Sequence, residues 1–128
     1  MSRSPENDGD PDWVNWTGNI EHRAPADNTP YYFFPENMAQ LTAVLQQAKQ
    51  AGVKLRVSGQ RHSQPPLVAD DNRDNPPPTP DVYLVDMSCY YDVATDGITL
   101  GPKPNQITVN PGVREDFADA FLTKNNLI

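Results

Sequence analysis

The residues best suited to binding an anion lie in one short stretch, Val57-Ser58-Gly59-Gln60-Arg61-His62-Ser63-Gln64-Pro65-Pro66-Leu67. A glycine lets the backbone turn tightly and approach a ligand closely. The exposed N–H groups of such a turn, with Arg61 beside them, suit an anion such as a pyrophosphate. His62 would then face a ring attached to that pyrophosphate. A lone loop histidine is more often a surface or hydrogen-bonded structural residue, so both interpretations of His62 stay open.

Three apolar runs predict the strands of a small sheet. Residues 53–57 alternate apolar and basic side chains, which is typical of a β-strand with one buried face, and this strand leads into the glycine stretch. Residues 31–34 form a short aromatic strand that ends at Pro35. Residues 82–85 are mostly apolar, which favours a central position in the sheet. Residues 97–100 and 106–110 read as a hairpin.

Two amphipathic segments predict helices. Asn37 is a suitable N-cap for a helix over 38–51, and Gly52 provides its C-terminal stop. A second helix is expected over about 114–125. The expected apolar faces consist of Met38, Leu41, Val44, Leu45 and Ala48 in the first helix and Phe117, Ala118, Phe121 and Leu122 in the second. The pattern therefore predicts an α+β fold with a small mixed sheet and two main helices.

The length of 128 residues corresponds to one domain. Residues 1–11 are polar and acidic and are expected to be a disordered tail, so the domain would span 12–128. Trp13 and Trp16 are three positions apart and cannot both line one face of a straight strand, which favours a kinked extended arm. Residues 69–80 are acidic and proline-rich and are expected to form a surface insertion between two strands.

Charge and cysteine content exclude several classes of function. The net charge of −7 and the isoelectric point near 4.5 argue against nucleic acid and acidic membrane surfaces as partners. The single cysteine, Cys89, excludes an internal disulfide and a cysteine-cluster metal site. Neither a secretory signal nor a run long enough to span a membrane is found in the sequence, so a cytoplasmic location is expected.

Five motifs follow one another over roughly residues 13–128. They are Asn15-Trp16-Thr17-Gly18-Asn19, Pro35 with the helix after it, Arg56 with Gly59, His62 and Ser63, Leu84-Val85-Asp86, and Val109-Asn110-Pro111-Gly112-Val113. In this order they resemble the start of the FAD-binding domain of the vanillyl-alcohol oxidase / p-cresol methylhydroxylase (PCMH) type, and within it sugar-lactone, alditol and flavin-linked sterol oxidases.

The resemblance implies that FAD is the cofactor and that the stretch from Ser58 to Ser63 wraps its pyrophosphate. His62 matches the residue that many relatives link covalently to the flavin 8α-methyl group, and a cation at Arg61 would favour the neutral imidazole that such a link requires. Many relatives have a glycine where this chain has Arg61. The cofactor-binding residues implied are Arg56, Ser58, Gly59, Gln60, Arg61, His62, Ser63 and Leu67.

The resemblance also implies that much of the family's domain is missing. The next glycine-rich segment of the FAD site and the substrate domain would follow Ile128, so the chain alone is expected to bind FAD weakly or not at all and to be inactive. In a full-length context it would serve an oxidase that takes hydride from a CH–OH group of an alcohol or lactone. The alternatives are a non-catalytic remnant, a half-domain that needs a separate C-terminal partner, and a generic acidic α+β interaction domain.

Overall fold

A three-stranded parallel sheet lies at the centre of the fold. The computed structural model describes residues 13–59 and 68–127. In the sheet, β5 (Val82–Asp86) lies between β3 (Tyr32–Phe33) and β4 (Lys54–Ser58). Every residue of β5 is buried, which confirms the prediction that this strand is central. The sheet is wholly parallel because the helical connection from β3 carries the chain back to the same end before β4 begins.

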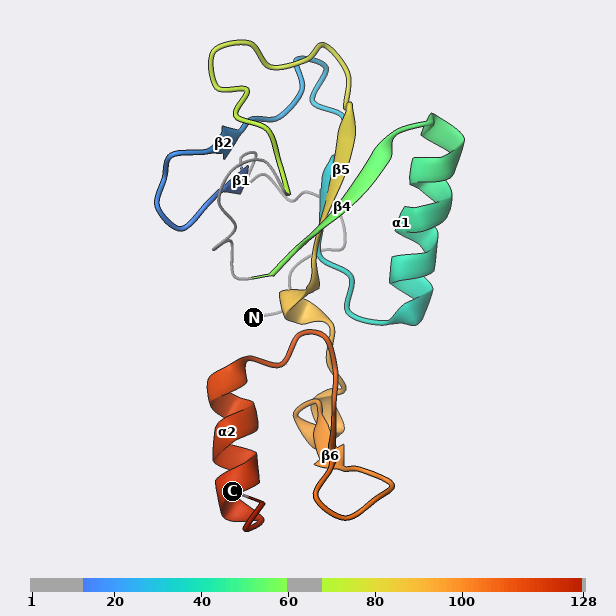
Figure 1. Ribbon diagram of the computed structural model, residues 1–128. Coiled ribbons are helices and arrows are strands. Elements are labelled where there is room, and N and C mark those ends of the chain that lie inside the picture. The colour runs from blue at the N-terminus through green and yellow to red at the C-terminus, as the bar shows by residue number, and fades with distance from the viewer. Residues whose placement is uncertain (1–12, 60–67, 128) are drawn as a thin grey trace.

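The helix α1 (Met38–Ala51) makes this connection and lies along one side of the sheet (Figure 1). Its predicted bounds and both predicted caps are confirmed. The side chain of Asn37 accepts a hydrogen bond from the backbone N–H of Gln40, at 3.0 Å. Gly52 adopts the left-handed conformation, with φ of 69°, and its N–H donates to the carbonyls of Ala48 and Lys49.

The apolar face of α1 is narrower than predicted. Val44 and Ala48 are buried and Leu41 packs against the core, but Met38 is 64% exposed and Leu45 is 47% exposed. Met38 and Leu45 are seven positions apart and lie on the same margin of the stripe, which the three-stranded sheet leaves in contact with water.

The strand β4 also carries an exposed apolar residue. Val57 was expected on the buried face of its strand, but its side chain is 57% exposed. β4 is an edge strand, so its carboxyl end can extend past the side chains that cover the middle of the sheet.

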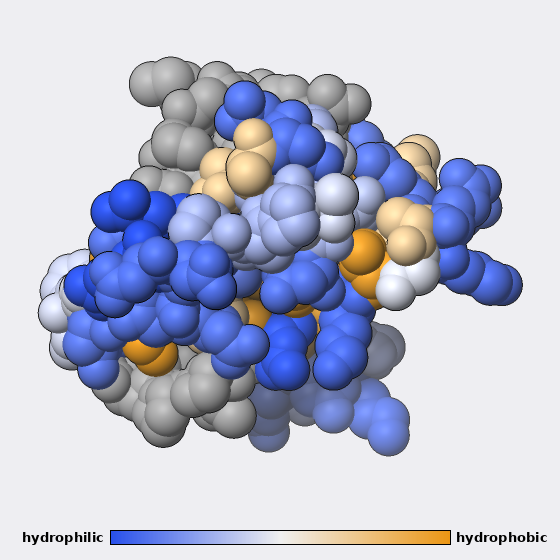
Figure 2. All heavy atoms as spheres, turned by 90° about the horizontal axis from the view of Figure 1, so that it is seen from above, coloured by the Kyte–Doolittle hydropathy of each residue, from blue (hydrophilic) through white to orange (hydrophobic). Residues whose placement is uncertain are grey.

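On the other side of the sheet from α1 lies an antiparallel pair, β1 (Trp13–Val14) and β2 (Glu21–His22) (Figure 1). Trp13 is buried in the core, whereas Trp16 is 76% exposed, which confirms that the two indoles do not share a face. The connection from β4 to β5 packs here too. The carbonyls of Pro77 and Pro78 accept hydrogen bonds from Ala26 and Asp27. Seen from above, this part of the surface is mainly hydrophilic (Figure 2).

After β5 the chain leaves the sheet and forms a second lobe (Figure 1). Two short 3-10 helices, η1 (Met87–Cys89) and η2 (Val93–Thr95), lead to the antiparallel hairpin of β6 (Ile98–Leu100) and β7 (Ile107–Val109), which confirms the predicted hairpin. The lobe ends with α2 (Glu115–Lys124), one residue shorter at each end than predicted.

The prediction of one small mixed sheet is wrong. The described residues form three separate sheets: the parallel one and two antiparallel pairs. The antiparallel β6–β7 hairpin does not extend the central sheet because the turns of η1 and η2 carry the chain away from it first. The general class, α+β with two main helices, is as expected.

The predicted apolar face of α2 is only partly covered, since Ala118, Phe121 and Leu122 are half-buried. None of its residues, all of which the structure describes, is buried, and Phe117 is 62% exposed. Most helices in folded domains owe their stability to packing of their apolar face, so α2 depends on few contacts.

Candidate functional site

The predicted anion-binding stretch begins at the carboxyl end of β4. Ser58, the last residue of β4, is fully buried and pairs with Asp86 at the end of β5. Its hydroxyl oxygen accepts a hydrogen bond from the indole Nε1 of Trp13, at 2.9 Å. This bond fixes the point at which the backbone leaves the sheet. Gly59 follows directly and is exposed.

The neighbouring central strand also ends in a fixed polar group. Asp86 is buried, and one of its carboxylate oxygens accepts a hydrogen bond from the Tyr32 hydroxyl at 3.1 Å. The other oxygen accepts from the backbone N–H of Ser88, at 2.9 Å, and so caps η1. Both oxygens are therefore engaged in holding the chain where it turns out of the sheet, and we assign this carboxylate a structural role.

The segment before α2 packs directly on η1 through Gly112. The N–H of Gly112 donates to the carbonyl of Tyr90, at 2.8 Å. A Cβ at this position would lie 2.7 Å from the Met87 carbonyl oxygen and 2.9 Å from the Tyr90 nitrogen. Only glycine allows this approach of two backbones. The contact brings the start of α2 to the carboxyl ends of β4 and β5.

These segments enclose a cleft of about 750 Å³, which we call the glycine cleft. It is lined by Trp16, Gly59, Met87, Ser88, residues 111–116 and Asp119. Three of the sequence motifs therefore meet here. Trp16 belongs to the motif at 15–19, Gly59 to the predicted anion-binding stretch, and residues 111–113 to the motif that precedes the second helix. The carboxyl ends of parallel strands are a common place for ligands in α/β sheets.

The described lining of the glycine cleft is acidic. Glu115, Asp116 and Asp119 contribute three carboxylates against the one guanidinium of Arg114. Arg114 is itself paired with Asp116, at 3.2 Å between Nε and Oδ1. The carboxylates suit the amino-terminal end of α2 because they oppose the positive end of the helix dipole. They would repel a pyrophosphate placed beside them, so an anion would have to bind at the Gly59 side of the cleft.

The Gly59 side has room for a ligand. Among the residues that the structure describes, no atom lies within 4 Å of a Cβ added to Gly59, so none of them keeps a ligand from its backbone. The exposed indole of Trp16 lies on the same cleft. These described residues fit the rings and the backbone contacts of a dinucleotide, whereas the charge needed by its pyrophosphate must come from elsewhere.

The structure places three of the eight predicted site residues. Gly59 lies in the glycine cleft, Ser58 is buried beneath it, and Arg56 is partly exposed on β4. Gln60, Arg61, His62, Ser63 and Leu67 lie outside the described residues. Their predicted contacts with FAD, including the covalent link through His62, therefore stay predictions.

Sequence reasoning missed several residues of the cleft. Trp16 was interpreted as an anchor of the N-terminal arm, and Met87, Ser88 and Arg114 were given no role. Trp16 and Gly112 both lie in motifs that the family resemblance had identified, and this could have marked them as candidate site residues. What the sequence could not show is that these motifs meet at one place.

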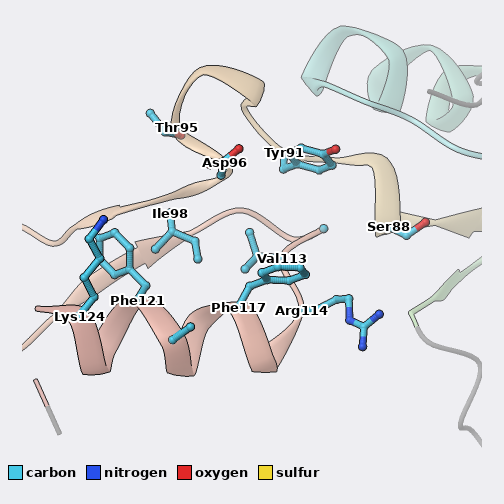
Figure 3. Close-up of a pocket in the computed structure, with 12 residues that line it drawn as sticks. Ser88, Tyr91, Thr95, Asp96, Ile98, Val113, Arg114, Phe117, Phe121 and Lys124 are labelled. Atoms are coloured by element: carbon cyan, nitrogen blue, oxygen red, sulfur yellow. The ribbon is translucent and has the colours of Figure 1, made fainter. Parts of the chain in front are cut away.

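A second hollow, of about 680 Å³, lies beside the apolar face of α2. Phe117 and Phe121 point from α2 toward Ile98 and Val113, with Tyr91 on the opposite wall (Figure 3). Its polar residues are spread along the margin, and it contains none of the residues predicted to bind a cofactor. We therefore regard it as incomplete packing of α2 and take the glycine cleft as the candidate site.

Solved structures of cholesterol oxidase share this fold. The enzyme from Brevibacterium sterolicum superposes with a TM-score of 0.67 at 18% sequence identity, over 98% of this chain and 23% of that chain. A histidine-to-alanine mutant of the same enzyme gives a TM-score of 0.66 at 17% identity, over 98% of this chain and 22% of that one. The chain thus spans less than a quarter of the length of these oxidases.

The sequence itself matches no protein-family model and no curated protein. The likeness is therefore one of fold, which this chain shares with part of cholesterol oxidase. Assignment to the PCMH type stays a prediction.

Neither of the described helices is long and apolar enough to cross a membrane. Within residues 13–59 and 68–127, no three His, Cys, Asp or Glu side chains gather closely enough to hold a metal ion.

Proposed function

We propose that this chain is an FAD-binding portion of a flavin-dependent oxidoreductase. The observation that carries the proposal is the glycine cleft. Gly59 and Gly112 are separated by more than fifty residues in the sequence and belong to two motifs that resemble FAD-binding sequences, yet they line one hollow at the carboxyl ends of parallel strands. The shared fold with part of cholesterol oxidase supports the same assignment.

In this proposal each part of the predicted stretch has a distinct role. Gly59 lets the backbone approach the dinucleotide, and the N–H groups of the following residues, with Arg61, offset the pyrophosphate charge. Arg61 would supply the positive charge that the acidic side of the cleft does not. His62 forms the covalent link to the flavin. FAD, when bound, supplies the acceptor for two electrons, and the protein binds and orients it.

The substrate of the complete enzyme would be a small molecule with a CH–OH group, such as an alcohol or a lactone. The described residues of this chain provide no catalytic base that we can assign. We therefore propose that the chain by itself is inactive and that it contributes only part of the cofactor site.

A second candidate is a half-domain that functions only with a separate C-terminal partner, or a remnant that has lost its function. The exposure of α2 favours this candidate, because a helix with Phe117 62% exposed and no buried residue is poorly stabilised by the described chain alone. The FAD-binding portion and the remnant differ in one property, namely whether the glycine cleft retains any affinity for FAD.

The test is a titration of the ¹⁵N-labelled chain with FAD, followed by NMR. Weak binding is visible as movement of backbone amide signals in fast exchange. We expect saturable shifts for Gly59, Ser88 and Gly112, which line the cleft. Gly52 lies at the opposite end of β4 and should not move. Absence of saturable shifts at millimolar FAD would favour the remnant.

A further inference from the structure

The two tryptophans of the N-terminal arm have opposite environments. Trp13 is 1% exposed, and its indole nitrogen is bonded to Ser58. Trp16 is 76% exposed and lies on the glycine cleft. Burial of apolar surface therefore does not account for the position of Trp16.

A hydrogen-bonded turn nevertheless supports Trp16. The buried side chain of Asn15 accepts from the backbone N–H of Ile20 at 3.0 Å and donates to the side chain of Asn19 at 2.6 Å. Backbone bonds from Asn15 to Ile20 and from Gly18 to Asn15 close the same turn. The indole is thus carried at the cleft by an ordered backbone, which lowers the entropy cost of a contact with a ligand.

Charge determines which part of a dinucleotide suits this side of the cleft. The three carboxylates at the start of α2 disfavour phosphate in their vicinity. An uncharged planar ring does not suffer that repulsion, and an indole face is a good stacking surface for heteroaromatic rings. Because Trp13 is bonded to Ser58, the arm that carries Trp16 is tied to the residue just before Gly59.

We propose that Trp16 stacks on a planar heteroaromatic ring of the bound dinucleotide. The inference rests on the proposed function, since it names a residue that contributes to the same site. The ring is either the adenine or the isoalloxazine, which share this chemistry. Trp16 acts as a binding residue for the cofactor and takes no part in electron transfer.

The indole N–H signals provide the test, because the chain contains two tryptophans and one is an internal control. On titration of the ¹⁵N-labelled chain with FAD, the Trp16 indole signal should move together with the Gly59 amide, while the buried Trp13 indole signal should stay. AMP and FMN, titrated separately, assign the ring: AMP carries the adenine and FMN the isoalloxazine. Ribose 5-phosphate carries no ring and should leave Trp16 in place.

The outcomes separate the inference from the proposed function. A shift of the Gly59 and Gly112 amide signals without a shift of the Trp16 indole signal would overturn stacking and leave FAD binding intact. If none of the three signals shifts, both stacking and FAD binding are overturned. A shift of Trp16 by ribose 5-phosphate as large as that caused by AMP or FMN would also overturn stacking.

Two variants add a measure of affinity. Trp16→Ala should weaken FAD binding by about 5- to 10-fold, the lower end of the range for aromatic stacking on a base, because the indole lies at an exposed margin. Trp16→Phe should stay within about 3-fold of the native chain, since a smaller ring can still stack. Both variants should unfold at the native temperature, because Trp16 is exposed. Equal affinity of Trp16→Ala and the native chain would contradict the proposal.

Discussion

Trp13 and Ser58 are joined by a buried hydrogen bond of 2.9 Å from the indole Nε1 to the hydroxyl oxygen. The two residues are 45 positions apart in the chain. The bond connects the N-terminal arm to the end of β4, and so sets the position of Trp16 relative to Gly59 on the glycine cleft.

This bond can be measured with a double-mutant cycle. Trp13→Phe leaves the buried Ser58 oxygen without its donor and should lower the free energy of unfolding by about 2–4 kcal/mol, including lost packing. Ser58→Ala should cost about 1–2 kcal/mol. Urea denaturation of the single and double variants should give a coupling of about 1 kcal/mol. Additive effects would show that the bond contributes nothing to stability.

Substitution of Gly112 by alanine should destabilise the fold, whereas the same substitution at Gly59 should have little effect. Gly112→Ala should lower the free energy of unfolding by about 1–3 kcal/mol, because its Cβ would collide with the backbone of Met87 and Tyr90. Gly59→Ala should change stability by less than about 0.5 kcal/mol, because none of the described residues has an atom within 4 Å of its Cβ. Thermal unfolding of both variants is the measurement. Equal stability of the two would refute the packing of Gly112 on η1.

The contact between the β4–β5 connection and the N-terminal arm should become weaker in acid. Arg73 donates to Asp71 at 2.9 Å and to the carbonyl of Asn19 at 3.0 Å. The hydrogen bond from Arg73 lowers the pKa of the Asp71 carboxyl below its ordinary value of 3.8. Because the pKa of the folded state is the lower one, the stabilisation is complete well above 3.8 and is lost as the pH falls through the lowered pKa.

The Asp71–Arg73 pair can be tested by comparing unfolding temperatures at two pH values. Asp71→Asn should be slightly less stable than the native chain at pH 7, with a small effect because the pair is exposed to solvent and screened. The difference should narrow as the pH falls below 3.8 and through the lowered pKa, because the native carboxyl then becomes protonated as well. Arg73→Gln should converge less, because it also removes the bond to the carbonyl of Asn19, which does not depend on the charge of Asp71. A difference for Asp71→Asn that does not narrow as the pH falls would assign it to a cause other than the charge of this pair.

The predicted role of His62 can be tested in a longer oxidase that contains this sequence. His62→Ala should abolish flavin that remains bound after acid precipitation, because no imidazole would be available for the covalent link. Retention of the native circular dichroism spectrum would show that folding is unaffected. Flavin that survives acid precipitation in the variant would mean that another residue forms the link.

Local sequence signals predicted the elements well where the deciding contacts are themselves local. The bounds of α1 follow from the Asn37 cap and the left-handed Gly52, and both interactions lie within a few residues in the chain. β5 was correctly predicted as central because an unbroken apolar run suits a strand buried on both faces.

The predictions of burial were wrong where burial depends on how far the surface of a neighbouring element extends. Periodicity identified the apolar stripe of α1 but could not show that a three-stranded sheet covers only part of it, which leaves Met38 and Leu45 exposed. The exposure of Val57 has the same origin at the end of an edge strand. The β6–β7 hairpin was recognised, but its separation from the central sheet depends on the turns before it.

The candidate site was predictable only in part. The sequence indicated Gly59 and the motif around Gly112 separately, while their meeting depends on the backbone contact between Gly112 and Tyr90. That contact is between residues 22 positions apart, and no local pattern encodes it. Trp16 was assigned to the N-terminal arm together with Trp13, but only Trp13 is buried.

The most direct test of FAD binding by the glycine cleft is equilibrium dialysis of the purified chain against FAD. Because only part of the cofactor would be enclosed, we expect a dissociation constant on the order of 0.1–1 mM. Gly59→Val should weaken binding by roughly 10-fold or more through steric exclusion, whereas Met38→Ala on the exposed start of α1 should leave it unchanged. Binding that Gly59→Val does not affect would contradict the account, and no saturable binding at all would favour the remnant.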